Sequence, residues 1–274
     1  MIPVRRPAYE TPHATAVERI AGGLAERVAL AQAVQRAFLP ERTAMTWGSL
    51  SLRARNELCE DASGDYYDFV PLEDGRVVVA IGDVTGHGLG PALLMAQGRA
   101  FLRAFCRAAE PLGAVVGRVN DALSAEMTQG RFMSLFVAAI DPSTGAMSWC
   151  NAGHVPALLH RARTGETKAL GPTGVVLGAF PGFSFHAEEG LSLEPGDSLL
   201  LCSDGATEAR RPDGTLFGLD GMIKALERTP TGDADAVLEG VQEALDGWTE
   251  GRRLDDDLTL VSITRTGCEL RLVR

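Results

Sequence analysis

SGDYYDFVPLEDGRVVVAIGDVTGHG, residues 63–88, is the stretch that decides the fold. Two runs of strand-forming residues, 66–71 and 76–82, flank an Asp-Gly turn signal, and this pattern predicts an antiparallel hairpin. Asp65 lies just before the first run and Asp83 just after the second. Folding the hairpin at its turn therefore brings these two aspartates to the same open end.

Two runs near the end of the chain repeat this arrangement. Asp204 follows the apolar run SLLLCS, and the triplet Asp255–Asp257 directly precedes the run LTLVSI. If these runs form neighbouring antiparallel strands, Asp204 and the triplet share one sheet edge. A single aspartate at such a place is most simply a turn or cap residue. Four at matching strand ends repel one another, and a divalent cation would remove that cost.

The ligand chemistry of such an edge is restricted. Sites built only from oxygen select hard ions, which here means Mg²⁺, Mn²⁺ or Ca²⁺, and they disfavour zinc. Two ions about 3.5–4 Å apart would activate a water for attack on phosphorus.

Strands and helices cluster along the chain and do not alternate, which favours an α+β layered sandwich over a parallel α/β sheet. We expect Leu50–Leu58 and Ser198–Cys202 to be further strands, and a single antiparallel meander over residues 133–161. Helices are expected at 90–109, 111–127, 217–228 and 233–248, and closing strands at 258–264 and 269–273.

The segment before this pattern reads as a separate helix. Val17, Leu24, Ala31 and Phe38 recur every seven residues, and Pro40 ends the pattern. We therefore divide the chain into an N-terminal tail with a regulatory or dimerising helix, 1–40, and one folded domain, 41–274. A helix that packs on its own domain is an equally good interpretation.

Composition excludes several classes. The 274-residue chain has 26 Lys+Arg and 36 Asp+Glu, hence a net charge of −10, which argues against nucleic acid or an anionic membrane as a partner. Its apolar runs fall far short of the roughly 20 residues that a membrane span needs. Five cysteines without a CxxC pair predict reduced thiols and a cytoplasmic location.

The stretch GDVTGHGLGPALLMA, residues 82–96, invites comparison with a dinucleotide-binding loop. Its glycines follow the pattern GxGxG, however, and Pro91 occupies the place of the last glycine of that fingerprint. Asp83 would also face a pyrophosphate unfavourably. A nucleotide-binding oxidoreductase is therefore disfavoured.

Six stretches taken together resemble the bacterial SpoIIE/RsbU-type serine phosphatases, in the metal-dependent (PPM) superfamily that includes the type 2C protein phosphatases. They are SGDYYDF (63–69), GDVTGHGLGPALLMA (82–96), FMSLFVAAID (132–141), NAGHVPALL (151–159), CSDGATEA (202–209) and DDDLTLV (255–261). The resemblance implies a four-layer αββα sandwich, two central antiparallel sheets flanked by helices, with two Mn²⁺ or Mg²⁺ ions at one edge.

The resemblance also implies roles for individual residues. Asp83 would bridge both ions, and the Val84 carbonyl would ligate one of them. Asp204 and Asp256 would hold the other, and Asp65 would bind metal directly or through water. Asp83 and Asp204 are thus the expected catalytic residues.

Several positions depart from the family or carry no transferred role. Ser63 replaces a glycine that is usual there. In the eukaryotic branch of the superfamily, a histidine two residues after the bridging aspartate is a proposed general acid. That position is Thr85 here, and His87 comes four residues after Asp83, so the role is not transferred to His87. His154 is expected to stabilise a turn, no arginine is identifiable by motif as a phosphate clamp, and the loop 171–182 is either a flap over substrate or a plain surface loop.

The expected activity is that of a phosphoserine/phosphothreonine protein phosphatase without a covalent phosphoenzyme. The resemblance implies a phosphorylated STAS-domain anti-anti-sigma protein as substrate in a partner-switching pathway. The heptad spacing suggests a regulatory partner or a homodimer through residues 15–39. The alternative is a catalytically inactive phosphatase-like binding module, which manganese-dependent hydrolysis of an aryl phosphate would distinguish.

Overall fold

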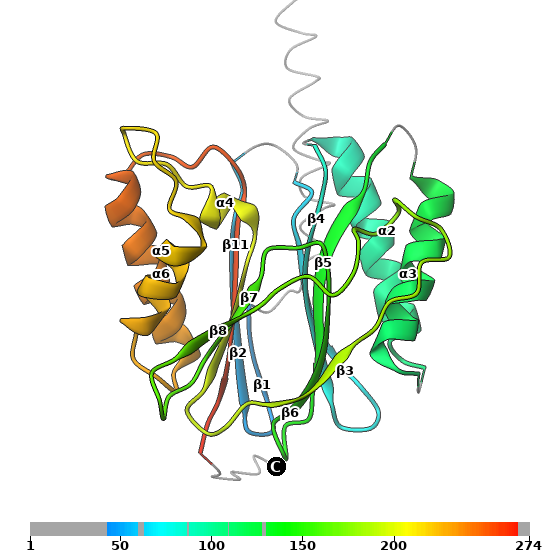
Figure 1. Ribbon diagram of the computed structural model, residues 1–274, viewed down its shortest axis with the longest axis horizontal. Helices are drawn as coiled ribbons and strands as arrows, with labels where there is room; N and C mark the ends of the chain where they lie inside the picture. Colours follow the sequence, from blue (N-terminus) through cyan, green and yellow to red (C-terminus); the bar gives the residue numbers. More distant parts are fainter. Residues whose placement is uncertain (1–42, 60–62, 87, 109, 128–129, 268–274) are drawn as a thin grey trace, which may run out of the picture.

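The computed structural model describes residues 43–59, 63–86, 88–108, 110–127 and 130–267, so the expected helix at 15–39 and strand at 269–273 lie outside it. Two antiparallel sheets face each other, and helices cover the outer face of each (Figure 1). The predicted αββα sandwich is thereby confirmed.

One sheet has five strands in the order β3-β4-β5-β6-β9, and the other has six in the order β1-β2-β11-β10-β7-β8. The five-stranded sheet comprises β3 (Tyr66–Pro71), β4 (Val77–Val84), β5 (Met133–Ile140), β6 (Ala146–Ala152) and β9 (Glu188–Ser192). The six-stranded sheet comprises β1 (Ala44–Trp47), β2 (Leu50–Glu57), β7 (Ala157–His160), β8 (Thr167–Leu170), β10 (Ser198–Cys202) and β11 (Leu258–Arg265).

The helices form the two outer layers. α2 (Leu89–Phe105) and α3 (Leu112–Glu126) cover the five-stranded sheet, while α5 (Gly218–Glu227) and α6 (Ala234–Thr249) cover the other, with the short α4 (Asp204–Thr207) at its edge (Figure 1). Asp233 caps α6, because its side chain accepts from the Asp235 and Ala236 amides.

The expected meander over 133–161 is wrong in its last strand. β5 and β6 do pair, but β7 leaves them and pairs with β10 and β8 in the other sheet. The four residues 153–156 thus take the chain across the sandwich. Every residue of β7 is buried, because the strand is covered by the facing sheet on one side and by helices on the other.

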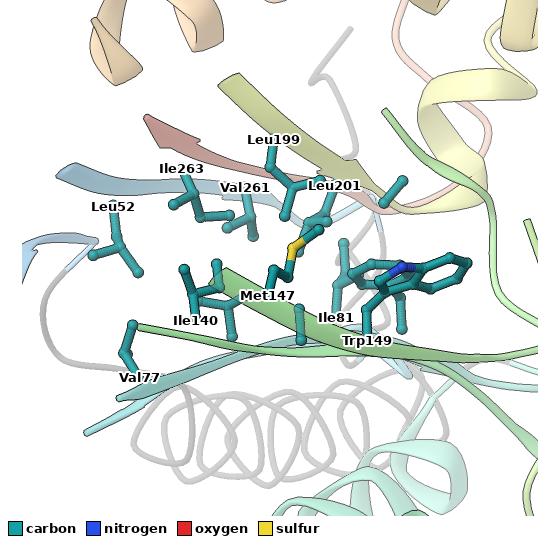
Figure 2. Packing of buried hydrophobic residues seen from close by; sticks show 14 of the residues in the cluster. Leu52, Val77, Ile81, Ile140, Met147, Trp149, Leu199, Leu201, Val261 and Ile263 are labelled. Carbon is teal, nitrogen blue, oxygen red and sulfur yellow. The ribbon is translucent and has the colours of Figure 1, made fainter. Parts of the chain in front are cut away.

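The central core is made by alternate residues of facing strands (Figure 2). Val77, Val79 and Ile81 of β4 point to the other sheet, whereas Val78 and Ala80 pack beneath the helices. Helices on both outer faces leave central strands with no solvated side, which is why β4 is a continuous apolar run. Burying each large apolar side chain stabilises the fold by about 1.5–3 kcal/mol.

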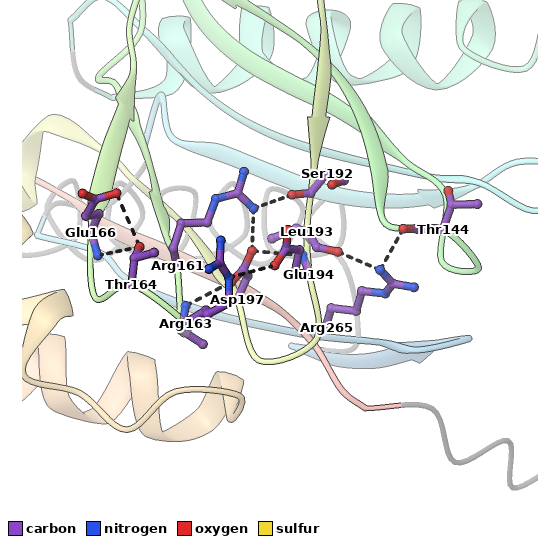
Figure 3. A network of polar contacts seen from close by, with 11 residues as sticks. Thr144, Arg161, Arg163, Thr164, Glu166, Ser192, Leu193, Glu194, Asp197 and Arg265 are labelled. Atoms are coloured by element: carbon purple, nitrogen blue, oxygen red, sulfur yellow. Dashed lines mark hydrogen bonds and ion pairs between the residues drawn. The ribbon is translucent and has the colours of Figure 1, made fainter.

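Polar contacts hold the sandwich together at the edge where β5 and β11 end (Figure 3). Arg161 donates to the Ser192 carbonyl at 2.6 Å and to the carboxylate of buried Asp197 at 2.5 Å. Arg265 donates to the Leu193 carbonyl at 2.9 Å. The opposite edge of the sandwich, where β4 ends and β11 begins, is not part of this network.

A buried carboxylate fastens α2 to β3. Asp68 has no exposed surface, and Arg103 donates to both of its oxygens at 2.6 and 2.7 Å. The Tyr66 hydroxyl donates to it at 3.0 Å, and the Arg99 guanidinium lies 3.7 Å away.

No helix in the described part of the chain is both long and apolar enough to cross a membrane. The four cysteines of that part, Cys59, Cys106, Cys150 and Cys202, are free thiols, as the spacing predicted.

Candidate metal centre

The hairpin of β3 and β4 has the predicted register. Tyr66 pairs with Gly82, so Asp65 lies opposite Asp83 at the open end. β10 and β11 are antiparallel neighbours, with Cys202 paired to Leu260, so the condition under which Asp204 and the Asp255–Asp257 triplet share one edge is met. The end of β4, α4 and the start of β11 all meet at the top of the molecule in Figure 1. Each sheet thus contributes aspartates to one edge.

The charges of these aspartates act on one another. Burial, followed by the charges of Asp204 and Asp256, raises the pKa of Asp83 to about 7. Burial and then the charge of Asp256 raise the pKa of Asp204. Carboxylates from both sheets are therefore close enough to disfavour each other's ionised forms, which is the electrostatic condition that a bound cation relieves.

Asp65 lies deeper than the others. It is 3% exposed, and its Oδ2 accepts from the Thr259 hydroxyl at 2.5 Å, while that hydroxyl accepts from the Asn56 amide at 2.7 Å. Burial raises its pKa well above the usual range, and the nearby Asp83 adds to the shift. One of its oxygens is thus already engaged within the protein.

Gly64 allows two oxygen donors to come together. A Cβ at this position would lie 2.4 Å from the Val84 carbonyl oxygen and 2.6 Å from Asp83 Oδ1, so any side chain would displace them. Gly205 has a similar role, because a Cβ there would lie 2.1 Å from the Asp257 carbonyl. The groups present fit a hard cation: they are carboxylates and a carbonyl, and glycine leaves the space beside them open.

The triplet before β11 is divided among three roles. The side chain of Asp255 is 81% exposed and lies 3.8 Å from Arg210. Asp256 is exposed, and its charge acts on both Asp83 and Asp204. Asp257 is buried and accepts from the Cys59 amide at 2.6 Å. Asp256 is the member of the triplet that acts on Asp204, and its effect on Asp83 exceeds that of Asp257, whose charge also acts on Asp65.

Among the described residues, no three Asp, Glu, His or Cys side chains come together as a complete ligand set. The aspartates are linked instead by the effects of their charges on one another's pKa.

Cys59 contacts the Asp255–Asp257 triplet, but its thiol donates to the Asp256 carbonyl at 2.8 Å and burial raises its pKa, so it is not an activated nucleophile. His154 lies in a turn held by Asn151, as expected, and burial lowers its pKa to about 4. Burial raises the pKa of Cys202 to about 12, so its thiol stays protonated. His87 lies outside the described residues.

Two arginines that no sequence motif indicates lie at this edge. Arg131 precedes Phe132, whose carbonyl accepts from the Thr85 amide, and its guanidinium packs so closely on Gly90 that a Cβ there would lie 2.6 Å from Nη1. Arg210 lies beside Asp255 on the other sheet. Neither sits in a recognisable motif. They can be recognised only when the pairing of the strands is known, because the pairing shows which residues lie together at this edge.

The loop 171–182 is attached to the body of the protein. Asn120 of α3 accepts from the Gly178 amide at 3.0 Å and donates to the Phe180 carbonyl at 3.0 Å, and Asp121 accepts from the Gly182 amide. Leu177 also bridges to Met133. These contacts favour the interpretation as a surface loop over that of a flap.

Comparison with known proteins places this site in context. Residues 73–266 match the family described as Stage II sporulation protein E (SpoIIE). Protein IcfG of Synechocystis is 28% identical over 236 residues, which cover 76% of this chain and 37% of IcfG. Phosphoserine phosphatase RsbU of Bacillus subtilis is 26% identical over 242 residues, covering 87% of this chain and 70% of RsbU.

The chain thus spans little more than a third of IcfG. Among solved structures, the SiaA-PP2C domain of Pseudomonas aeruginosa superimposes with a TM-score of 0.76 at 20% identity, covering 90% of this chain and 99% of that one. This likeness supports the fold.

Proposed function

Because the chain belongs to the SpoIIE family, we propose that it is a metal-dependent protein-serine/threonine phosphatase whose centre is the aspartate edge. The observation that carries the proposal is the effect of the charges of Asp204 and Asp256, at the edge of one sheet, upon Asp83 on the other. The relative RsbU, named a phosphoserine phosphatase, supports the same reaction.

The residues present would hold two Mn²⁺ or Mg²⁺ ions. Asp83 would bridge them, the Val84 carbonyl would ligate one, and Asp204 and Asp256 would hold the other. Asp65 would bind directly or through water with the oxygen that Thr259 leaves free. Solved structures of this fold contain such ions, namely RsbX with magnesium (19% identity, TM-score 0.58) and the PstP catalytic domain with two manganese ions (16%, 0.58).

The bound ions would supply a reactive water at neutral pH and neutralise charge that develops on the phosphoryl oxygens. The protein's own contribution is to fix the carboxylates at one edge, through Gly64 and the hydrogen bond from Thr259 to Asp65. No thiol is needed, and the protonated Cys202 offers none.

The experiment is hydrolysis of an aryl phosphate with Mn²⁺ and with EDTA. We expect activity only with Mn²⁺, and we expect Asp83→Asn and Asp204→Asn each to abolish turnover while the circular dichroism spectrum is kept. Asp74→Asn is the matched control, because Asp74 lies at the closed end of the same hairpin. A folded wild-type protein that fails to hydrolyse the substrate would favour the inactive binding module instead.

As substrate we propose a phosphorylated STAS-domain anti-anti-sigma protein, from the family resemblance. A panel of such phosphoproteins, incubated with and without Mn²⁺ and followed by phosphate release, tests this. Hydrolysis of an unrelated phosphoprotein at the same rate would contradict it.

A further inference from the structure

The two halves of the aspartate edge belong to different sheets. Asp83 ends β4 in the five-stranded sheet, and Asp204 directly follows the Cys202–Ser203 end of β10 in the six-stranded sheet. Hydrogen bonds fix distances within each sheet, whereas side-chain packing sets the distance between them. The spacing of the two carboxylates therefore depends on which side chains lie between the sheets at this edge.

His154 lies where the chain crosses from one sheet to the other. It follows β6 and precedes β7, and Asn151 holds its backbone from both sides: the His154 amide donates to Asn151 Oδ1 at 2.8 Å, and the Asn151 amide donates to the His154 carbonyl at 3.1 Å. The residue is only 4% exposed. Its ring is thus confined between the layers.

The ring faces both halves of the site. Its Nδ1 is 2.7 Å from the Ser134 hydroxyl, and Ser134 is the register partner of Asp83 on the neighbouring strand. On the other side lies the carbonyl of Cys202, two residues before Asp204, and His154 Nε2 is a buried nitrogen that completes no hydrogen bond. A single planar side chain therefore spans the gap between the two strand ends.

We propose that His154 is a positioning residue that sets the distance between the strand end bearing Asp83 and the strand end bearing Asp204, and so the spacing of a shared pair of divalent cations. This inference rests on the proposed function, because it assigns the spacing of the same metal centre.

The chemistry of the ring explains why histidine suits this place. In the tautomer protonated at Nε2, the N–H is directed to the Cys202 side and Nδ1 accepts from the Ser134 hydroxyl. An imidazole has no rotatable bond between its two nitrogens, so the span is rigid. Glutamine also has a donor and an acceptor, but they lie at the end of a longer, more flexible side chain and point in less divergent directions than the two ring nitrogens.

The experiment compares His154→Gln and Ser134→Ala with His160→Gln. His160 is the matched control: it is also 4% exposed and bonded to one hydroxyl, Thr167 at 3.0 Å, but it lies at the other end of β7. Free Mn²⁺ is measured by electron paramagnetic resonance during titration. The melting temperature in EDTA and the kcat and KM for an aryl phosphate are measured on the same samples.

We expect His154→Gln to weaken binding of at least one Mn²⁺ about tenfold, in the range found for residues that orient metal ligands. kcat should fall more than KM rises. Ser134→Ala should also weaken Mn²⁺ binding. The double variant should bind Mn²⁺ no more weakly than His154→Gln alone, because both single substitutions remove the same hydrogen bond between Ser134 and His154. His160→Gln should bind Mn²⁺ like wild type even if it melts earlier.

Wild-type Mn²⁺ affinity in both His154→Gln and Ser134→Ala would overturn the positioning role, as would an equal loss in His160→Gln. Ser134→Ala keeps the test decisive if His154→Gln does not fold. A wild-type protein that binds no Mn²⁺ would refute the proposed function and this inference together. Normal Mn²⁺ binding by the wild type and by all variants would refute only the positioning role of His154.

Discussion

The charges of Asp204 and Asp256 disfavour the ionised form of Asp83, the charge of Asp256 disfavours the ionised form of Asp204, and burial raises the pKa of both Asp83 and Asp204. Such an arrangement stabilises nothing by itself in the metal-free protein. Its residues are kept close by their neighbours: Gly64 leaves room for Asp83, and Thr259 holds Asp65. At the scale of single residues, removing one of these charges should therefore raise the stability of the metal-free protein and lower its activity.

Asp83→Asn should stabilise the metal-free protein while it abolishes turnover. The folded protein binds more protons at Asp83 than the unfolded chain between pH 3.8 and about 7, so this carboxylate makes stability fall as the pH rises through that window. We expect a gain of up to about 4 kcal/mol at pH 8, since the pKa of Asp83 is raised by about three pK units and each corresponds to about 1.4 kcal/mol. The gain should shrink towards pH 4.

Urea unfolding in EDTA at several pH values measures this gain. Asp74→Asn is the control, because Asp74 is exposed and its pKa is lowered, so it stays ionised across this window. Equal stability of Asp83→Asn and wild type at pH 8 would mean that Asp83 is not under electrostatic strain.

Cys202→Ala should keep close to wild-type kcat with Mn²⁺. Nucleophilic attack needs a thiolate, and burial keeps the pKa of Cys202 near 12. Steady-state hydrolysis of an aryl phosphate checks the rate, and insensitivity of the wild type to iodoacetamide checks the same point chemically. A large loss of kcat in the variant would indicate a thiol phosphatase.

At the scale of elements, α2 begins directly after the loop that follows β4, so its attachment to the sheet matters to the site. Gly88, at a φ of 86°, is its N-cap, and Pro91 is its third residue. The ion pairs of Asp68 with Arg103 and Arg99 fasten the C-terminal half of this helix to β3.

Asp68→Ala should cost about 3 kcal/mol of unfolding free energy, because it leaves the half-buried guanidinium groups of Arg103 and Arg99 and the buried Tyr66 hydroxyl without their partner. Glu110→Ala is the control: its pair with Arg118 is exposed on both sides and should cost at most about 1 kcal/mol. Urea denaturation measures both. A similar small effect of the two variants would show that Asp68 does not hold α2 in place.

At the scale of the whole molecule, every residue of the proposed centre lies between positions 63 and 257, within the sandwich that the structure describes. The N-terminal helix proposed over 15–39 contributes none of them. Catalysis and regulation should therefore be separable.

Deleting residues 1–39 should leave Mn²⁺-dependent hydrolysis of an aryl phosphate in place and convert a dimer into a monomer. Analytical ultracentrifugation and the aryl phosphate assay measure the two properties. An unchanged oligomeric state together with unchanged regulation would reject a role of this segment in dimerisation or partner binding.

Much of the fold could be predicted from the sequence because it is written in local patterns. Alternating and continuous apolar runs gave β3, β5 and β10 to the residue, and the Asp-Gly turn placed Asp65 opposite Asp83. The short edge strands β1, β8 and β9 were missed. β8 and β9 have mostly exposed or half-buried residues, so no apolar run marks them.

Tertiary structure decided what depends on contacts between distant segments. The sequence of β7 does not say which sheet it joins, because a strand buried on both faces is equally apolar in either. Three features of the site depend on contacts between residues far apart along the chain. They are the hydrogen bond from Thr259 to Asp65, the different environments of Asp255–Asp257, and the position of His154 between the sheets. A single sequence therefore determines which oxygens end the strands, and packing of one sheet on the other determines how closely they meet.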